Sequence, residues 1–220
     1  MSRTYRTSPV RFDASPVQSE ERDGWTVVLE YAEEKDGPWL IDLSHLPRWD
    51  VQDRDLSQYQ PCGLDIPESP GMCVLGEKVT VNRMNRTQAS IWHLGPNGQD
   101  MPQERAYTDI RENTLCLALL GPKAQALSEK VTNLDLADPK RKTPCLIQGP
   151  MAHVPCQIVL LSSDRHKQPG FVFTCSRGYA RDVVHTLLAA GEEFGLRPAG
   201  EGRIAASGPP LLSWAGPVQD

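Results

Sequence analysis

The sequence predicts an α+β fold, a strand-rich domain with a few amphipathic helices. Short apolar runs, several with the alternating pattern of β-strands, recur along the chain, and one long segment near the C-terminus repeats apolar residues at helical spacing. With 220 residues, of which 39% are hydrophobic, the chain can bury a substantial core. We expect an N-terminal arm over residues 1–24, one domain over 25–200 and a tail rich in glycine and proline over 201–220.

The first half of the chain contains four expected strands. The apolar runs Thr26–Ala32 and Trp39–Leu43 are the first two. The segments KVTVNRM and ASIWHL then alternate apolar and polar residues, and the polar residues Asn85–Gln88 lie between them. Alternation on both sides of a short polar turn is typical of a β-hairpin.

The second half begins with a strand that leads into a helix. The run Thr114–Leu120 is apolar throughout, Gly121 interrupts it, and Pro122 suits the first turn of a helix over GPKAQALSEKV. Two further apolar runs, Cys156–Ser162 and Phe171–Ser176, flank a polar segment. These two runs predict a second hairpin.

A longer amphipathic helix is expected after the last of these strands. Its apolar positions recur at helical spacing, with charged residues between them, and are Ala180, Val183, Val184, Leu187, Leu188 and Phe194. Gly195 is the expected C-terminal stop. In the tail that follows, Leu211, Leu212 and Trp214 would be costly to leave in water, so we expect them to pack on this domain or on a partner.

Composition excludes several classes of function. The net charge is −5 and the lysines and arginines are dispersed along the chain, which argues against a nucleic-acid partner, since the phosphate backbone requires concentrated positive charge. No run approaches the ~20 apolar residues of a membrane span, and the N-terminus lacks the apolar core of a secretory signal. We therefore expect a cytoplasmic protein with no membrane partner.

Cysteines and histidines give no sign of a metal site. The six cysteines show no CxxC spacing, and Cys116 and Cys175 lie inside apolar runs, so we expect reduced and mostly buried thiols. The five histidines form no HxH or HxxxH pair, so no zinc site is expected.

The stretch WLIDLSHLPRWDV places Asp42, Ser44 and His45 together before a proline. The favoured interpretation is a strand end, where short polar side chains cap free backbone amides and the imidazole bonds to a neighbouring carbonyl. The alternative is a ligand contact by His45. A nucleophilic pair of Ser44 and His45 is not expected, because adjacent strand residues point to opposite faces.

The order of these segments resembles the folate-binding aminomethyltransferase superfamily of the glycine cleavage T-protein. The resemblance runs from about Trp39 to Gly200, and its most specific pieces are DLSHLPRWDV and LALLGPKA. Within that superfamily the chain is most similar to the gamma subunits of heterotetrameric sarcosine oxidases. The resemblance implies a strand-rich, T-protein-like α+β domain.

Two departures from the T-protein pattern imply that its chemistry is lost. Where T-proteins carry paired aspartates that act on the folate-linked one-carbon unit, GMCVLGEKVTV has Glu77 and Lys78, and a neighbouring lysine favours the ionised carboxylate over a poised acid. The T-protein motif RxGYTGExGFE contains a glutamate for the pterin ring. The segment DRHKQPGFVFTCSRGYA matches its glycine and phenylalanine at Gly170 and Phe171 but has no glutamate.

The resemblance therefore implies a non-catalytic gamma-type subunit of a sarcosine oxidase-like complex, which oxidatively demethylates N-methyl amines and transfers the one-carbon unit to tetrahydrofolate. Tetrahydrofolate, FAD, FMN, NAD and zinc would belong to the partner subunits. Two alternatives remain open: a stand-alone folate-dependent aminomethyltransferase or methyltransferase, and a free-standing module that carries a small ligand. His45 and Glu77 are the expected residual folate-cavity positions, and Leu211, Leu212 and Trp214 the expected subunit interface.

Overall fold

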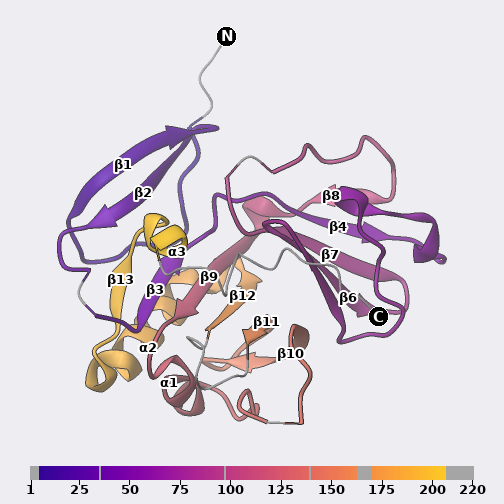
Figure 1. The fold of residues 1–220 in the computed structure, drawn as a ribbon. Helices are drawn as coiled ribbons and strands as arrows, with labels where there is room; N and C mark the ends of the chain where they lie inside the picture. Colours follow the sequence, from indigo (N-terminus) through magenta and orange to yellow (C-terminus); the bar gives the residue numbers. More distant parts are fainter. Residues whose placement is uncertain (1–4, 35, 97, 139, 163–169, 207–220) are drawn as a thin grey trace.

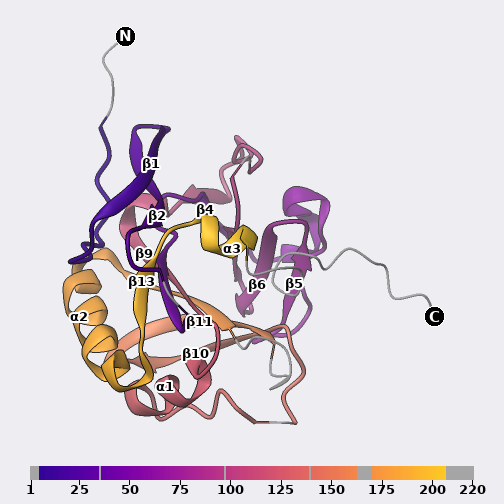
Figure 2. The same ribbon diagram turned by 60° about the vertical axis from the view of Figure 1, so that its left-hand side comes forward.

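The computed structural model describes residues 5–34, 36–96, 98–138, 140–162 and 170–206, and it contains two main sheets and a smaller hairpin (Figures 1 and 2). The hairpin pairs β1 (Pro16–Arg22) with β2 (Trp25–Tyr31). The first main sheet, called sheet B, has the order β10 (Cys145–Met151), β11 (Val154–Ser162), β12 (Gly170–Ser176), β9 (Thr114–Leu120), β3 (Trp39–Asp42), β13 (Arg197–Ala199). Sheet C has the order β5 (Cys73–Gly76), β6 (Val79–Asn85), β7 (Gln88–His93), β4 (Arg48–Gln52), β8 (Tyr107–Asp109).

Three α-helices and five short 3-10 helices complete the described part of the chain. The α-helices are α1 (Ala124–Val131), α2 (Ala180–Gly191) and α3 (Gly202–Ala206). The 3-10 turns are η1 (Leu56–Gln58), η2 (Pro61–Gly63), η3 (Arg111–Asn113), η4 (Arg177–Tyr179) and η5 (Glu192–Phe194). The α+β class expected from the sequence is confirmed.

The molecule is layered, because each sheet buries one face against the next layer. Helices α1 and α2 cover one face of sheet B, where the alternate β9 residues Leu115, Leu117 and Leu119 point into a shared core. The other face of sheet B packs against sheet C through residues such as Ala118 and Trp92. The outer face of sheet C forms a third core under the η1 and η2 segment.

Strongly patterned segments fold as predicted. The hairpins β6–β7 and β11–β12 form, β9 has the predicted bounds, and α2 continues through η5 to Gly195, whose φ of 79° closes it in the left-handed conformation. One detail was wrong: Pro122 precedes the helix, because Lys123 adopts φ 65° and α1 begins at Ala124. All six cysteines are free, and four of them are buried.

The structure places contacts across both expected domain boundaries. Strand β1 lies within the expected N-terminal arm and pairs along its length with β2. Beyond residue 200, Ile204 is buried in the core between the sheets, and the backbone N–H of Glu201 donates to the carbonyl of Val28 at 2.9 Å. Gly200 permits this approach, because a Cβ there would lie 2.2 Å from the backbone of Leu29.

Candidate functional site

The corner after β3 is held by polar contacts to neighbouring backbone. Asp42 accepts a hydrogen bond from the backbone N–H of Ser44 at 2.9 Å and another from the hydroxyl of Ser8. The Ser44 hydroxyl bonds to β9 instead of to an imidazole, because its Oγ accepts from the Cys116 N–H at 3.1 Å and donates to the Cys116 carbonyl at 3.4 Å. Ser44 is therefore a structural residue, as the sequence predicted.

Arg48 fixes the same corner from inside the protein. Its guanidinium is completely buried and, within the described part of the chain, forms no ion pair with a carboxylate. Burial lowers its pKa from the ordinary arginine value. Its donors instead reach Thr114 Oγ1 at 3.0 Å and the carbonyls of Leu43 (3.1 Å), Leu46 (2.9 Å), Ser44 (3.1 Å), Arg111 (2.9 Å) and Thr114 (3.3 Å).

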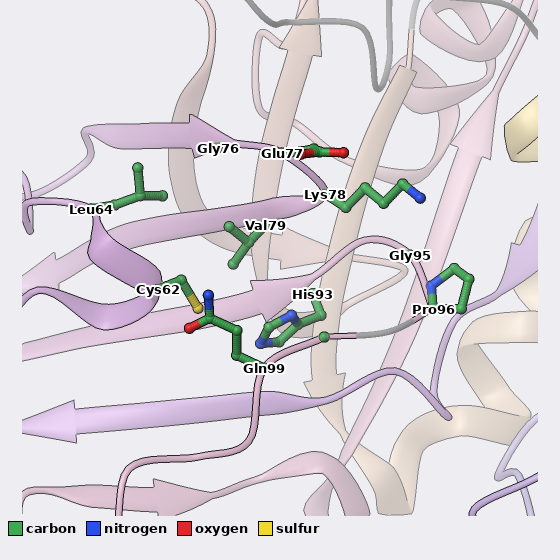
Figure 3. Close-up of a pocket in the computed structure, with 11 residues that line it drawn as sticks. Cys62, Leu64, Gly76, Glu77, Lys78, Val79, His93, Gly95, Pro96 and Gln99 are labelled. Carbon is green, nitrogen blue, oxygen red and sulfur yellow. The ribbon is translucent and has the colours of Figure 1, made fainter.

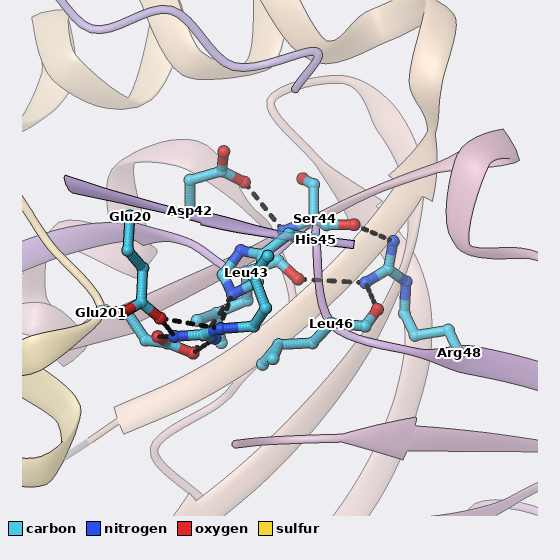
Figure 4. Close-up of polar contacts among 9 residues, drawn as sticks. Glu20, Asp42, Leu43, Ser44, His45, Leu46, Arg48 and Glu201 are labelled. Carbon is cyan, nitrogen blue, oxygen red and sulfur yellow. Dashed lines mark hydrogen bonds and ion pairs between the residues drawn. The ribbon is translucent and has the colours of Figure 1, made fainter. Parts of the chain in front are cut away.

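The His45 imidazole contacts side chains and, among the described residues, no carbonyl, which differs from the sequence interpretation. Its Nε2 lies 3.1 Å from Oε1 of Glu201, which comes from the segment between β13 and α3 (Figure 4). Arg22 at the end of β1 donates to both carboxylate oxygens of Glu201, at 3.0 and 2.8 Å. These three residues, called the Arg22–His45–Glu201 cluster, tie together three segments that are remote in the sequence.

The cluster holds Glu201 as a carboxylate. Burial by itself favours the neutral acid, but hydrogen bonds from His45 and Arg22 and their charges outweigh burial and lower the pKa of Glu201 to about 2. The hydrogen bonds that Arg22 donates to Glu201 in turn raise the pKa of Arg22. The arrangement therefore joins a buried carboxylate to a cation, which suits a structural contact better than a proton-transfer group.

The two predicted folate-cavity residues line different hollows. His45 borders one of about 290 Å³, which lies between the N-terminal hairpin and the loop after β7. Glu77 borders another of about 350 Å³ at the end of sheet C (Figure 3). Glu77 and Lys78 are both exposed there, at the turn between β5 and β6. The two hollows share Pro96, Gly98 and Gln99, but neither is lined by both His45 and Glu77.

Sequence reasoning missed a polar row on the face of sheet C that packs toward sheet B. The register aligns Asn82 with Ser90 and Ser90 with Asp50, so the three side chains share one face across β6, β7 and β4. Nδ2 of Asn82 and Oδ1 of Asp50 are buried without a hydrogen-bond partner among the described residues. Burial also raises the pKa of Asp50. The alternation of these residues with Val81, Ile91 and other apolar positions was the available signal.

Three further expectations concern membrane spans, metal sites and the C-terminal tail. No helix in the described ranges is long and apolar enough to cross a membrane. Among the same residues, no three histidine, cysteine or acidic side chains are grouped as a metal site would need. The predicted interface residues Leu211, Leu212 and Trp214 lie outside the described residues.

The comparison with protein sequences gives one partial match. No protein-family model matches the chain. An aminomethyltransferase of Clostridium botulinum strain Langeland is 26% identical over 127 residues, which are 56% of this chain. The matched stretch is 32% of that curated protein, so the chain spans about a third of its length.

Solved structures match over more of the chain. Heterotetrameric sarcosine oxidase from Corynebacterium sp. U-96, in complex with pyrrole 2-carboxylate, contains a chain that aligns with a TM-score of 0.57 and 17% identity, over 70% of this chain and 84% of its own. Glycine cleavage system aminomethyltransferase T from Bartonella henselae aligns with a TM-score of 0.59 and 16% identity, over 91% of this chain and 61% of its own. At sequence identities of 16% and 17%, these alignments show a shared fold. The resemblance predicted from the sequence is therefore confirmed at that level: the chain has the fold of the glycine cleavage T-protein and of a chain of heterotetrameric sarcosine oxidase.

Proposed function

We propose that the protein is a non-catalytic, gamma-type subunit of a cytoplasmic sarcosine oxidase-like complex that demethylates N-methyl amines. The observation that carries this proposal is the extent of the structural match. A chain of heterotetrameric sarcosine oxidase aligns over 84% of its own length, whereas aminomethyltransferase T aligns over 61%. The aligned residues are 84% of the sarcosine oxidase chain but 70% of this chain. The sarcosine oxidase chain is therefore the shorter of the two.

The chemistry of the corner after β3 supports a structural role. Ser44 bonds to the backbone of β9, and Arg48 is occupied by carbonyl groups. His45 faces a carboxylate whose pKa is about 2. A general acid or base works best with a pKa near the operating pH, and this carboxylate is far from that range. Ser44, His45 and Arg48 are thus occupied by backbone groups or by Glu201, which supports a packing role for this corner.

Purification from an organism that encodes the chain tests the proposal directly. The tagged full-length chain should co-purify with flavin-containing subunits in a constant ratio, measured by mass spectrometry and by flavin absorbance. The complex should oxidise an N-methyl amine, and the isolated chain should not. Isolation as a lone polypeptide without flavoprotein partners, under conditions that preserve other complexes, would refute the subunit role.

The tail provides a sharper prediction about assembly. Substituting alanine for Leu211, Leu212 and Trp214 together should reduce co-purification at least about tenfold, because large apolar residues anchor interfaces. Truncation after Gly208 should have the same effect. The melting temperature of the isolated domain should change by no more than about 2 °C, because the buried Ile204 is retained.

Tyr179→Ala is the matched control for this prediction. Tyr179 is also a large apolar residue and is 49% exposed, but it lies in η4, away from the tail in the sequence. This variant should leave co-purification unchanged. If the truncated chain instead aggregates at once, the tail packs on its own domain and the subunit interface lies elsewhere.

The alternative function is a folate-dependent aminomethyltransferase. The observation that favours it is the polar row, in which Asp50 and Asn82 have buried polar atoms without partners among the described residues, together with the partial match to an aminomethyltransferase. Buried polar atoms without partners are rare in folded proteins, and a catalytic role is one of the explanations for them. The row would present one carboxylate and one amide to a bound ring.

Calorimetric titration with tetrahydrofolate separates the two functions. Under the subunit proposal, binding to the isolated chain should be weaker than about 10 μM, or roughly −7 kcal/mol, because the acidic pair is replaced by Glu77 and Lys78. Tighter binding that is lost in Asp50→Asn would place the aminomethyltransferase first. Tighter binding that survives this substitution would point to a folate site elsewhere in the chain.

A further inference from the structure

The cavity at the end of sheet C has a neutral floor and a charged rim. Its volume is about 350 Å³, and it is lined by the turn between β5 and β6, the end of β7, the η2 turn and the loop after β7. Val79 and His93 form part of the floor and are buried, whereas Glu77, Lys78 and Gln99 are exposed at the rim. The cavity lies on the opposite face of sheet C from the polar row. The pair Thr80 and Trp92 shares the face of the polar row, and the neighbouring pair Val79 and His93 therefore points to the other face.

His93 is the unexplained group in this cavity. The residue is 3% exposed, and its Nε2 has no hydrogen-bond partner among the described residues. Its ring packs edge-on against Trp49, with centroids 4.8 Å apart, which fixes its orientation. Burial lowers the pKa of His93 to about 4, so the imidazole is neutral near pH 7. A buried polar nitrogen without a partner is destabilising, and a ligand that hydrogen-bonds to it removes that cost.

The lining specifies the class of ligand. Figure 3 shows the imidazole of His93 turned toward Gln99 and Cys62. A neutral imidazole and a side-chain amide each offer a donor and an acceptor, and the edge of a cyclic amide presents the complementary pair. The floor contains no charged group, so a charged ligand would be desolvated there without a partner. The volume lies at the small end of known ligand sites, which limits the occupant to about one ring.

We propose that this cavity binds a compact, uncharged cyclic amide or related heterocycle, whose polar edge bonds to Nε2 of His93 and to the amide of Gln99. The site does not depend on the subunit role, because none of its lining residues belongs to the Arg22–His45–Glu201 cluster or to the polar row. Binding at this site and assembly into a complex can therefore succeed or fail separately.

Nuclear magnetic resonance of the full-length chain, labelled with ¹⁵N at histidine, tests the proposal with 2-pyridone as the probe. The imidazole signals of His93 should shift and saturate with a Kd of about 1 mM, as expected for a ligand of this size. The other four histidines should not respond. Benzoate, a charged molecule of similar size, should bind at least about tenfold more weakly.

Two substitutions make the test specific. His93→Phe keeps a ring against Trp49 but removes both nitrogens, so it should weaken 2-pyridone binding at least about tenfold without loss of folding. The matched control is His185→Phe, because His185 is exposed on α2 and does not line the cavity. The wild-type titration decides the question even if the His93 variant does not fold. Absence of a His93 response up to about 10 mM 2-pyridone, or equal binding of benzoate, overturns the proposal.

Discussion

Replacement of Arg48 by lysine is expected to destabilise the protein by at least about 3 kcal/mol. Arg48 donates to five backbone carbonyls and one hydroxyl while it is completely buried. Lysine has a single nitrogen with three donors, so it cannot reach this spread of acceptors. Each buried carbonyl that loses its partner costs about 1–3 kcal/mol, and the ammonium itself would be desolvated without a carboxylate.

Urea unfolding, followed by far-ultraviolet circular dichroism, measures this effect. The midpoint should fall while the slope with denaturant stays constant, and the melting temperature should fall by about 6–12 °C for a chain of this size. Arg54→Lys is the matched control, because Arg54 is exposed, and this change should stay within about 0.5 kcal/mol. A loss below about 1 kcal/mol for Arg48→Lys would mean that the carbonyls find other partners.

The second large effect concerns Glu201→Gln, which should cost about 2–3 kcal/mol at pH 7. The pKa of Glu201 falls from 4.5 to about 2 on folding, which is the result of its contacts with His45 and Arg22 outweighing burial. Each pKa unit of this kind corresponds to about 1.4 kcal/mol of unfolding free energy. The Arg22 side chain is 25% exposed, so solvent screening makes the expected loss smaller than the full pKa shift would give.

The pH dependence gives this prediction a definite sign. A carboxylate whose pKa is lowered by folding stabilises the protein above its unfolded pKa, and this stabilisation is lost as the pH falls through the folded pKa. The difference in unfolding free energy between wild type and Glu201→Gln should therefore be constant above about pH 5.5 and shrink between about pH 4.5 and pH 2. Urea unfolding at a series of pH values measures it.

Glu192→Gln is the control for the Glu201 prediction, because Glu192 is exposed at the end of α2. Its unfolding free energy should follow that of the wild type at every pH. A Glu201→Gln variant whose deficit persists unchanged at pH 3 would show that the loss comes from packing and not from the ionised carboxylate.

The Arg22–His45–Glu201 cluster also links the corner after β3 to the proposed interface. Glu201 immediately precedes α3, and α3 leads into the tail that carries Leu211, Leu212 and Trp214. The cluster thus anchors the start of the tail to the N-terminal hairpin and to His45. Under the proposed subunit role, His45 would serve assembly by fixing where the tail departs.

The sequence by itself determined the elements whose signals are local. The apolar run of β9, the alternation of β6 and β7 and the helical spacing of α2 each act within one segment, and all three formed as predicted. The order of these segments also identified the fold. Short strands such as β8 and β13, with three residues each, carried too little pattern to be recognised.

Only the tertiary structure decided the contacts of the polar residues. His45 meets Glu201 across 156 positions of sequence, and the meeting depends on the passage of Gly200 against β2. Likewise, Asp50 and Asn82 share a row only because β7 pairs with both β4 and β6. Periodicity predicts which face of an element is buried, but the partner of a buried polar group depends on how separate elements pack, and no local pattern encodes that.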